Sequence, residues 1–411
     1  MMARVHVIGA GLAGLSAAVE LAERSEVALY EAAPQAGGRC RSYFDSTLNM
    51  TIDNGNHLLL SGNSAALDYA RKTGGFDKLA IFEEAAFDFC DLERGARWRL
   101  RPNAGKIPWW ILVPDRRLPD TAGLDYLALA KMLFAKPGQT LRPFLGDGDV
   151  ARRLWDPIFV SALNTAPEEA SATLAAAIVR ETFAKGGDSC RPVVAVEGLS
   201  AAFVDPALAW LRGRGAQVAF GAKLRGLVFD GERVAALDFG EHTVALDAGD
   251  QVVLAVTAPV AAELLPGLSA PTEFRSIVNA HFACAAPKHM PLLTGVIGGW
   301  TEWVFAFPDR LSVTISAAER FLATSREELA AHIWDEVQAV AGLTAPLPAW
   351  QIIKEKRATF AATPAQDAVR PGPATGWRNL FLAGDWVQTG LPSTIEGAIR
   401  SGLSAAALAL A

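Results

Sequence analysis

The 411-residue sequence is poor in cysteine, has no excess of positive charge and contains no long unbroken apolar run. Its four cysteines, Cys40, Cys90, Cys190 and Cys284, form no Cys-x-x-Cys pair. This scarcity indicates neither a disulfide framework nor a zinc site, so we expect no metal and a reducing, cytoplasmic location. The net charge of −6 argues against a nucleic-acid partner. No stretch holds about eighteen consecutive apolar residues, so we expect no membrane-spanning helix.

The N-terminal stretch carries the first strong motif. Val5 to Ile8 reads as an apolar strand that leads into Gly9-x-Gly11-x-x-Gly14, and a helix is predicted from Leu15 to about Glu23. The first glycine permits a tight turn, the second lets a pyrophosphate approach the backbone, and the third allows the helix to pack closely on the strand. The N–H groups around Leu12 and Ala13 would face the phosphates at the positive end of the helix dipole. The motif therefore predicts a dinucleotide site.

The next two segments extend this site. A second strand, Val27 to Tyr30, ends at Glu31, about twenty residues after the central glycine, where an acidic side chain binds the adenosine ribose. The loop that follows contains Gly37, Gly38 and Arg39. We expect it to return under the pyrophosphate, with Arg39 or Arg41 pairing with phosphate oxygens.

Two later segments leave alternatives open. Asp53-Asn54-Gly55-Asn56-His57 interrupts apolar sequence and is either a plain turn or a backbone that approaches a ligand. Lys106 to Arg117 places prolines, tryptophans and apolar residues between basic ends, which suits a membrane interface or, equally, a buried loop. Leu124 to Phe134 reads as an amphipathic helix. Trp300, Trp303, Phe305 and Phe307 are expected mostly in the core, with a minority lining an apolar cavity.

Residues 191–264 read as a return to the nucleotide-binding domain. A helix is predicted over 201–212 and strands over 217–220, 224–229, 234–239 and 251–256, the last apolar enough for a buried parallel strand. We therefore predict two discontinuous domains. Residues 1–70, 191–264 and 365–411 would bind the dinucleotide, and residues 71–190 and 265–364 would bind the substrate.

The C-terminal stretch carries the second strong motif. Asn379 to Asp385 reads as a strand ending in Gly384-Asp385, and Gly397 to Leu410 reads as a closing helix, whose start is favoured by the preceding Pro392, Ser393 and Thr394. Asp385 is suited to accept a hydrogen bond from a ribityl hydroxyl. The helix start, at Ser393, Thr394 and Ile395, would face the N1/C2-carbonyl side of a flavin. Together with the N-terminal motif, this predicts flavin adenine dinucleotide (FAD) rather than a nicotinamide nucleotide.

These motifs together resemble the flavin-containing amine oxidase and phytoene desaturase superfamily. The likeness spans most of the chain, including Val218 to Pro259. It implies a mixed α/β fold with a Rossmann-like FAD-binding domain and a discontinuous, amine oxidase-like substrate-binding domain. It also implies that Val218 lies beside the adenine, and that Gly55 and Asn56 belong to the cofactor site.

Within the superfamily, Asp53 to Leu60 and Leu391 to Gly402 are most similar to the squalene-associated branch, the hydroxysqualene dehydroxylases. Asn56 departs from that pattern, in which proline precedes the histidine. The resemblance implies reductive removal of an allylic hydroxyl from hydroxysqualene, giving squalene for hopanoid-type lipids. It makes His57 the best candidate for the proton donor, with Asp53 as its partner. The alternative is that both residues only shape the loop over the flavin.

Other functions remain open at this point. A desaturase acting on a carotenoid precursor, an amine oxidase, or a non-enzymatic prenyl-protein-binding relative would share the fold, and the residues alone do not set the direction of hydride transfer. The single Gly-x-Gly-x-x-Gly indicates no second nucleotide domain, so the reductant would be external, either NADPH or a redox protein. We expect an apolar isoprenoid substrate and peripheral contact with the inner face of the cytoplasmic membrane.

Overall fold

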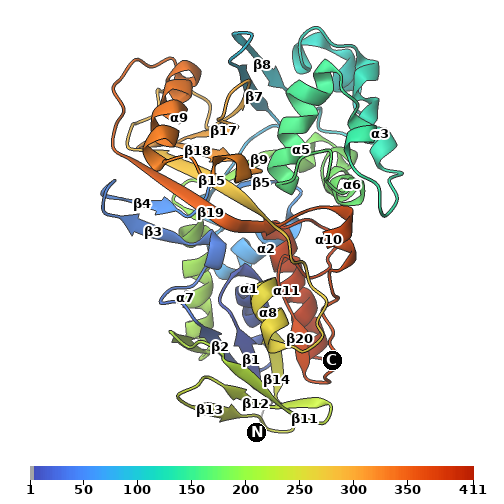
Figure 1. Ribbon diagram of the computed structural model, residues 1–411, viewed down its shortest axis with the longest axis vertical. Coiled ribbons are helices and arrows are strands. Elements are labelled where there is room, and N and C mark those ends of the chain that lie inside the picture. Colours follow the sequence, from blue (N-terminus) through green and yellow to red (C-terminus); the bar gives the residue numbers. More distant parts are fainter. Residues whose placement is uncertain (1–3) are drawn as a thin grey trace.

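The computed structural model describes residues 4–411, and a five-stranded parallel sheet forms one end of the molecule (Figure 1). The strand order is β10-β2-β1-β14-β20. The strands are β1 (Arg4–Ile8), β2 (Glu26–Glu31), β10 (Gln217–Phe220), β14 (Gln251–Leu254) and β20 (Leu380–Leu382). Segments from the beginning, middle and end of the sequence therefore lie side by side. Val252 to Leu254 are fully buried, as expected for a parallel strand covered on both faces.

Two helices pack on this sheet and on each other. Helix α1 (Leu12–Leu21) lies against α11 (Ile395–Ala409), and the Ser16 hydroxyl donates a hydrogen bond to the Ile399 carbonyl. Small residues permit the close approach, since a Cβ on Gly402 would lie 2.1 Å from the Ala13 carbonyl oxygen. Helix α1 begins three residues before the predicted start, because the last glycine of the motif is itself helical. Helices α2 (Ser64–Thr73) and α7 (Asp205–Gly213) complete this layer.

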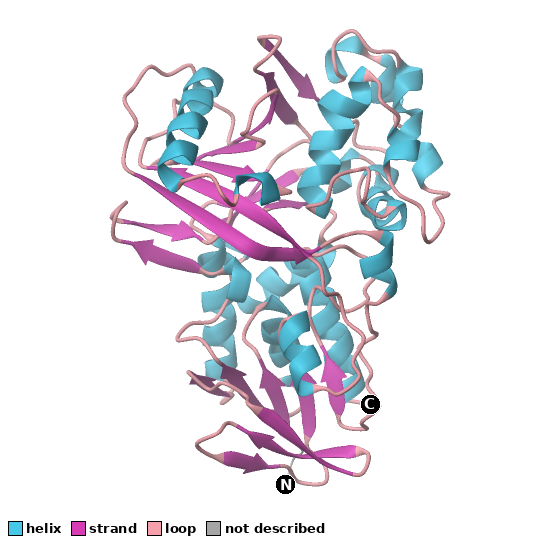
Figure 2. Ribbon diagram, viewed as in Figure 1, coloured by secondary structure: helices cyan, strands magenta, loops and turns pink. Residues whose placement is uncertain are grey.

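A seven-stranded mixed sheet, of order β19-β15-β18-β17-β16-β7-β8, dominates the other end (Figure 2). Its strands are β7 (Phe87–Asp91), β8 (Ala96–Leu100), β15 (Phe274–Phe282), β16 (Leu293–Ile297), β17 (Trp303–Ala306), β18 (Leu311–Ile315) and β19 (Trp350–Phe360). Helix α9 (Arg326–Ala341) packs on one face. Ser325 caps this helix, because its hydroxyl accepts a 3.0 Å bond from the Glu328 amide.

The opposite face of this sheet packs against a layer of short helices. These are α3 (Ala128–Met132), α4 (Arg142–Leu145), α5 (Asp156–Leu163) and α6 (Ala172–Glu181). Trp303, Phe305 and Phe307 are buried in this core, as expected for most of the aromatic residues near them. Within residues 4–411, no helix has both the length and the apolar composition needed to cross a bilayer.

Smaller elements join the two ends. They are the hairpin β3 (Ser42–Asp45) and β4 (Met50–Asp53), the sheet of β5 (Leu58–Leu60), β9 (Pro192–Ala195) and β6 (Leu79–Ile81), the sheet of β11 (Gly226–Asp230), β12 (Arg233–Asp238) and β13 (Thr243–Ala245), and helices α8 (Ala258–Leu264) and α10 (Pro364–Ala368). Because β5 pairs with β9, the segment that follows His57 is anchored to residues more than a hundred positions away.

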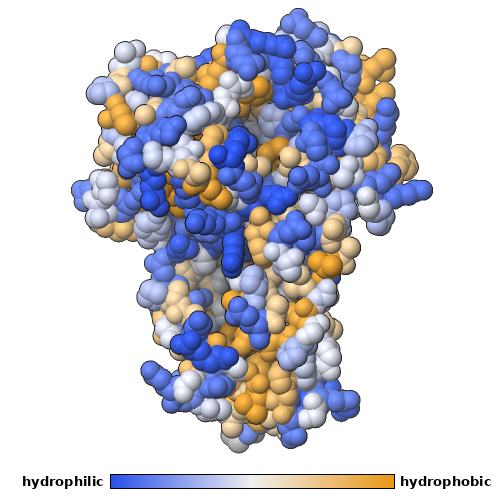
Figure 3. Space-filling view, viewed as in Figure 1, coloured by the Kyte–Doolittle hydropathy of each residue, from blue (hydrophilic) through white to orange (hydrophobic). Residues whose placement is uncertain are grey.

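Two segments differ from the sequence-based expectations. The predicted helix over Leu124 to Phe134 is a 3₁₀ turn (Gly123–Leu127) followed by the short α3. Between Lys106 and Arg117, Trp110 is buried while Ile107 and Leu112 are exposed, so this stretch is only partly a buried loop. Hydrophobic side chains reach the surface at the outer edge of the helical layer (Figure 3).

Candidate active site

The three glycines between β1 and α1 are needed for different reasons. An added Cβ at Gly9 would lie 2.4 Å from the Ala255 carbonyl oxygen, and one at Gly14 would lie 1.8 Å from the Gly9 carbonyl oxygen. Packing within the chain therefore requires both. At Gly11 an added Cβ would meet no atom within 4 Å, and the backbone is extended (φ −73°, ψ 175°). Nothing in the chain itself requires glycine at this position, whereas a phosphate approaching the helix N-terminus would.

Glu31 is fixed in orientation by backbone amides at the end of β2. One carboxylate oxygen accepts a 2.7 Å bond from the Ala10 amide, and the other accepts a 2.8 Å bond from the Ala33 amide. Each oxygen keeps a second lone pair, so the carboxylate retains acceptor sites for ribose hydroxyls. Val218 lies on the strand next to the one that ends at Glu31, because β10 pairs in parallel with β2 and places Val218 opposite Leu29.

An ion pair joins the two sequence motifs. Arg39 Nη2 lies 2.6 Å from Asp385 Oδ1, although the residues are 346 positions apart, and Arg39 Nη1 donates to the Ala358 carbonyl. Burial opposes ionisation of Asp385, but the charge and hydrogen bond of Arg39, with a bond from Ser393, lower its pKa below the ordinary value. Arg41, by contrast, is directed to the Gly38 carbonyl. Arg39 is therefore the arginine that reaches the second motif.

The start of α11 lies beside this pair. The Ser393 hydroxyl donates to the other Asp385 oxygen, and the Thr394 hydroxyl accepts a 3.0 Å bond from the Gly397 amide as the helix cap. Amide groups in the first turn, from Ile395 onward, have no acceptor within the helix. Arg370, which the sequence did not single out, is buried and donates to the carbonyls of Asp385, Trp386 and Val387. It fixes the backbone that presents Asp385.

The loop between β4 and β5 is held by a buried polar network from the large sheet. His281 contacts the Asp53 carbonyl (3.1 Å) and the Ser312 hydroxyl (2.8 Å). Asn279 accepts from the Asn56 amide and from the Thr314 hydroxyl, and donates to the Asn54 carbonyl. The motifs in the sequence did not indicate these residues, but alternating polar residues in two apolar strands (Asn279 and His281, Ser312 and Thr314) are a recognisable signal.

Gly55 and Asn56 sit within this network. A Cβ on Gly55 would lie 2.9 Å from Asn279 Nδ2, so the loop passes close to β15. Asn56 Nδ2 donates to the Thr314 hydroxyl at 3.2 Å. Within residues 4–411, Asn56 Oδ1 is buried without a hydrogen-bond partner. Buried acceptors are normally satisfied, so this oxygen is available to a bound group at the loop.

Asp53 and His57 have different surroundings. One Asp53 carboxylate oxygen accepts bonds from the Ser42 hydroxyl (2.5 Å) and the Leu199 amide (2.8 Å), which ties β4 to the segment before α7. This arrangement favours a loop-shaping role for Asp53. Burial, and then the charge of the nearby Arg39, lowers the pKa of His57 to about 4. His57 is therefore neutral at pH 7 and lies close enough to Arg39 for that charge to act on it.

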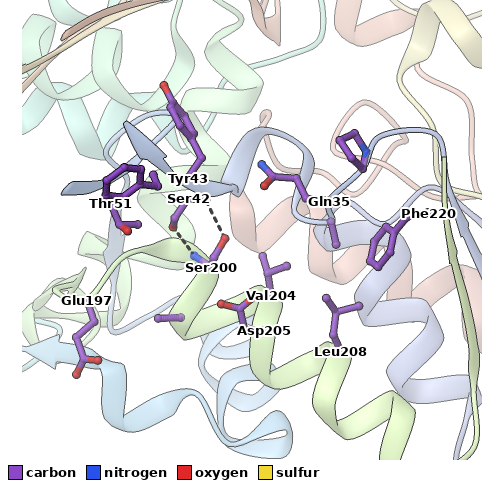
Figure 4. A pocket seen from close by; sticks show the side chains of 14 residues that line it. Gln35, Ser42, Tyr43, Thr51, Glu197, Ser200, Val204, Asp205, Leu208 and Phe220 are labelled. Carbon is purple, nitrogen blue, oxygen red and sulfur yellow. Dashed lines mark hydrogen bonds between the residues drawn. The ribbon is translucent and has the colours of Figure 1, made fainter. Parts of the chain in front are cut away.

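A surface pocket of about 460 Å³ lies beside Ser42, the residue whose hydroxyl holds Asp53 (Figure 4). Ser42 and Ser200 bond reciprocally in its wall, each amide donating to the other hydroxyl, at 2.8 and 2.9 Å. Tyr43, Asp205 and Phe220 also line it. The predicted cofactor-binding residues do not line this pocket, although Ser42 in its wall also holds Asp53.

Comparison with known proteins identifies the family. The flavin containing amine oxidoreductase family matches residues 12–410. The chain belongs to this family. The hydroxysqualene dehydroxylase of Rhodopseudomonas palustris is 55% identical over 414 residues, covering 100% of this chain and 99% of that protein. The hydroxysqualene dehydroxylase of Sinorhizobium fredii is 51% identical over 412 residues, covering 100% and 99%. A probable zeta-carotene desaturase of Synechococcus elongatus is 22% identical over 472 residues, covering 98% of each.

Solved structures share the fold. An oxidoreductase from Methanosarcina mazei superposes with a TM-score of 0.73 at 15% identity, covering 98% of this chain and 99% of that one. Cyclohexylamine oxidase from Brevibacterium oxydans gives 0.70 at 18% identity, covering 100% and 99%. The predicted mixed α/β, amine oxidase-like fold is confirmed.

As a member of this family, the chain is an FAD-dependent oxidoreductase, and the FAD prediction is confirmed at the level of the cofactor. The residues at the site fit a bound FAD. Space beside Gly11 is open to the pyrophosphate, Glu31 retains acceptor sites for the ribose, and Asn56 Oδ1 has no protein partner. The individual contacts to FAD remain predictions.

Proposed function

We propose that this flavin-dependent oxidoreductase removes the hydroxyl group of hydroxysqualene and replaces it with hydrogen, giving squalene. The observation that carries the proposal is the 55% identity, across the whole chain, to a protein named hydroxysqualene dehydroxylase. The desaturase alternative is less favoured, because the desaturase relative is far more distant. Atoms balance if one hydride and one proton enter and one water leaves.

We propose the following cofactor contacts. Gly9, Gly11, Leu12, Ala13 and Gly14 would hold the pyrophosphate at the start of α1, Glu31 the ribose, and Val218 the adenine. Gly38 and Arg39 would lie under the phosphates, Gly55 and Asn56 at the ring, and Gly384, Asp385, Ser393, Thr394 and Ile395 at the ribityl chain and ring edge. Bound in reduced form, FAD supplies the hydride. The division into two discontinuous domains at the predicted bounds is part of this proposal.

The chain's own residues would bind the hydrocarbon and exclude water. Phe89, Trp98, Trp303 and Phe305 are buried on the face of the large sheet that also carries Asn279 and Thr314. We propose that this face, with the helices packed on it, binds the isoprenoid chain. Aromatic faces stabilise a positive charge that develops when the hydroxyl leaves. An apolar enclosure also keeps water from competing for that charge.

We propose that His57 holds the departing oxygen. Because burial and Arg39 lower its pKa to about 4, a neutral imidazole N–H is the form present at pH 7. A neutral ring donates a hydrogen bond to the hydroxyl oxygen and orients it. Asp53 would position the loop through Ser42 and Leu199. Replacing His57 with Gln, which keeps an N–H donor, would preserve more activity than replacing it with Leu.

The test is anaerobic and uses the FAD-loaded protein. The flavin is reduced chemically, hydroxysqualene is added, and the visible flavin spectrum and the products are followed. Flavin reoxidation with squalene formed in equal amount supports the proposal. A flavin that stays reduced while the substrate persists contradicts it, and would direct attention to desaturation or amine oxidation by the oxidised enzyme.

We further propose that the reductant is external, NADPH or a redox protein, because the sequence contains one dinucleotide motif. The same proposal places the protein in the cytoplasm, at the inner face of the cytoplasmic membrane, where an apolar substrate partitions. Squalene formed there would feed hopanoid-type lipid synthesis.

A further inference from the structure

Exposed hydrophobic side chains are concentrated in one short part of the chain. Of the twelve large hydrophobic side chains exposed within residues 4–411, six lie between residues 107 and 134. These six include the four most exposed, Phe134 (81%), Ile107 (79%), Leu124 (77%) and Leu112 (73%), together with Trp109 and Leu127. Single exposed hydrophobic residues are ordinary, but a group on one surface marks an interaction site. We call these six residues the apolar surface.

Two turns, separated in sequence only by residues 113–122, contribute to this surface and are packed together. The turn Trp109–Leu112 contacts the turn Gly123–Leu127, and a Cβ on Gly123 would lie 3.3 Å from Leu112 Cδ2. Helix α3 continues directly from the second turn. In Figure 1 this region lies at the outer edge of the helical layer, and Figure 3 shows hydrophobic side chains at the surface there.

Packed aromatic rings support the apolar surface from within the core. The Trp110 and Tyr126 rings pack edge to face beneath it at 5.2 Å, and Tyr126 packs in the same way on the fully buried Trp155 at 5.9 Å. The Tyr126 hydroxyl also accepts a bond from the Leu118 amide. The inward side chains of both segments are thus used in the core. The outward ones have no partner among the described residues that would bury them.

Basic side chains flank the surface. Residues 106–136 contain Lys106, Arg116, Arg117, Lys131 and Lys136 against three aspartates, a net charge of +2, whereas the whole chain carries −6. The Arg116 guanidinium lies 4.9 Å from the centre of the Trp109 ring. Tryptophan beside arginine, next to protruding aliphatic side chains, is the composition that anchors proteins at the headgroup level of bilayers.

We propose that this apolar surface docks the protein on an anionic lipid bilayer. Ile107, Leu112, Leu124 and Phe134 insert below the headgroups, while the exposed Lys106, Lys131 and Lys136 pair with lipid phosphates. A second copy of the chain is a poorer fit, because its surface would bring like positive charges together. The idea that docking delivers an apolar substrate rests on the proposed function, but docking itself does not.

Vesicle sedimentation with the FAD-loaded, full-length protein tests docking without any substrate. The vesicles contain phosphatidylcholine with about 30 mol% phosphatidylglycerol, and phosphatidylcholine alone serves for comparison. The test variant is Leu124→Ser with Phe134→Ser. The matched control, Phe44→Ser with Leu347→Ser, removes the same side-chain types from exposed sites elsewhere. The flavin spectrum and thermal unfolding verify folding of each variant.

We expect the wild type to bind the anionic vesicles and to lose binding as salt rises from about 0.1 M to about 0.5 M. The test variant should bind at least about tenfold more weakly, and the control within about twofold of wild type. Lys131→Glu with Lys136→Glu should weaken only the anionic binding. Absence of wild-type binding, or equal losses in test variant and control, would overturn the proposal. So would a dimer in solution that Leu124→Ser with Phe134→Ser abolishes. Turnover with detergent-dispersed hydroxysqualene tests the proposed function separately.

Discussion

Replacing Gly11 with alanine separates what the fold needs from what the cofactor needs. An added Cβ at Gly11 meets no atom within 4 Å, and the backbone there is extended, so alanine fits without strain. Alanine is a poorer helix cap than glycine, but it also reduces the freedom of the unfolded chain. These effects oppose each other, so we expect the FAD-free variant to unfold within about 1 kcal/mol of wild type. Gly14→Ala places a Cβ 1.8 Å from the Gly9 carbonyl oxygen and should cost about 3 kcal/mol or more.

The effect of Gly11→Ala on FAD binding should be larger. A methyl group beside the helix N-terminus would displace the pyrophosphate and weaken at least one hydrogen bond to a charged group. That loss corresponds to about 1.5–3 kcal/mol, or about 10- to 150-fold in Kd. At an FAD concentration of about 100 times the wild-type Kd, the wild type gains about 2.7 kcal/mol of stability. A variant with about thirtyfold weaker binding gains only about 0.9 kcal/mol.

Urea unfolding at several FAD concentrations measures both quantities, with Gly14→Ala as the contrasting variant. The unfolding free energy without FAD reports on packing, and its increase with FAD reports on binding. If FAD-free Gly11→Ala were as unstable as Gly14→Ala, the reasoning from open space would be wrong. If FAD stabilised Gly11→Ala as much as it stabilises the wild type, the pyrophosphate would not approach this residue.

Two further predictions concern buried titratable groups. Arg39 and Ser393 lower the pKa of Asp385 against the effect of burial, so its carboxylate adds stability that is complete above the ordinary aspartate pKa of about 3.9 and is lost as pH falls below it. Asp385→Asn should cost about 1–3 kcal/mol at pH 7, since Arg39 remains partly exposed, and should flatten the acid end of the urea stability profile; an unchanged profile would refute the pairing. Burial, and then Arg310, lowers the pKa of His281 to about 4, so stability falls as pH drops from about 6.5 to about 4 while only the unfolded chain takes up a proton. His281→Gln should lower proton uptake on unfolding in this window by about one, and a ring that titrates normally by NMR would contradict the prediction.

The nucleotide-binding strands were predictable because local patterns encode them. The runs at β1, β2, β10 and β14 were recognised within a few residues from apolar composition and bounding glycines. Short helices were harder, and Leu124 to Phe134 proved to be a 3₁₀ turn followed by a short helix. Its apolar residues follow a helical spacing, but several of them face outward. Hydrophobic periodicity cannot distinguish a row of apolar side chains that faces the core from a row that faces the surface.

The sequence by itself determined that the chain binds a dinucleotide, because glycine spacing and a strand-end acid are local requirements of phosphate and ribose binding. It also indicated the flavin family through two motifs at opposite ends. Only the tertiary structure decided that Arg39 meets Asp385, that Asn279 and His281 hold the Asp53 to His57 loop, and that Gly11 has no packing role. These contacts join residues more than 200 positions apart, or depend on the space around one atom, and neither property is encoded in a local pattern.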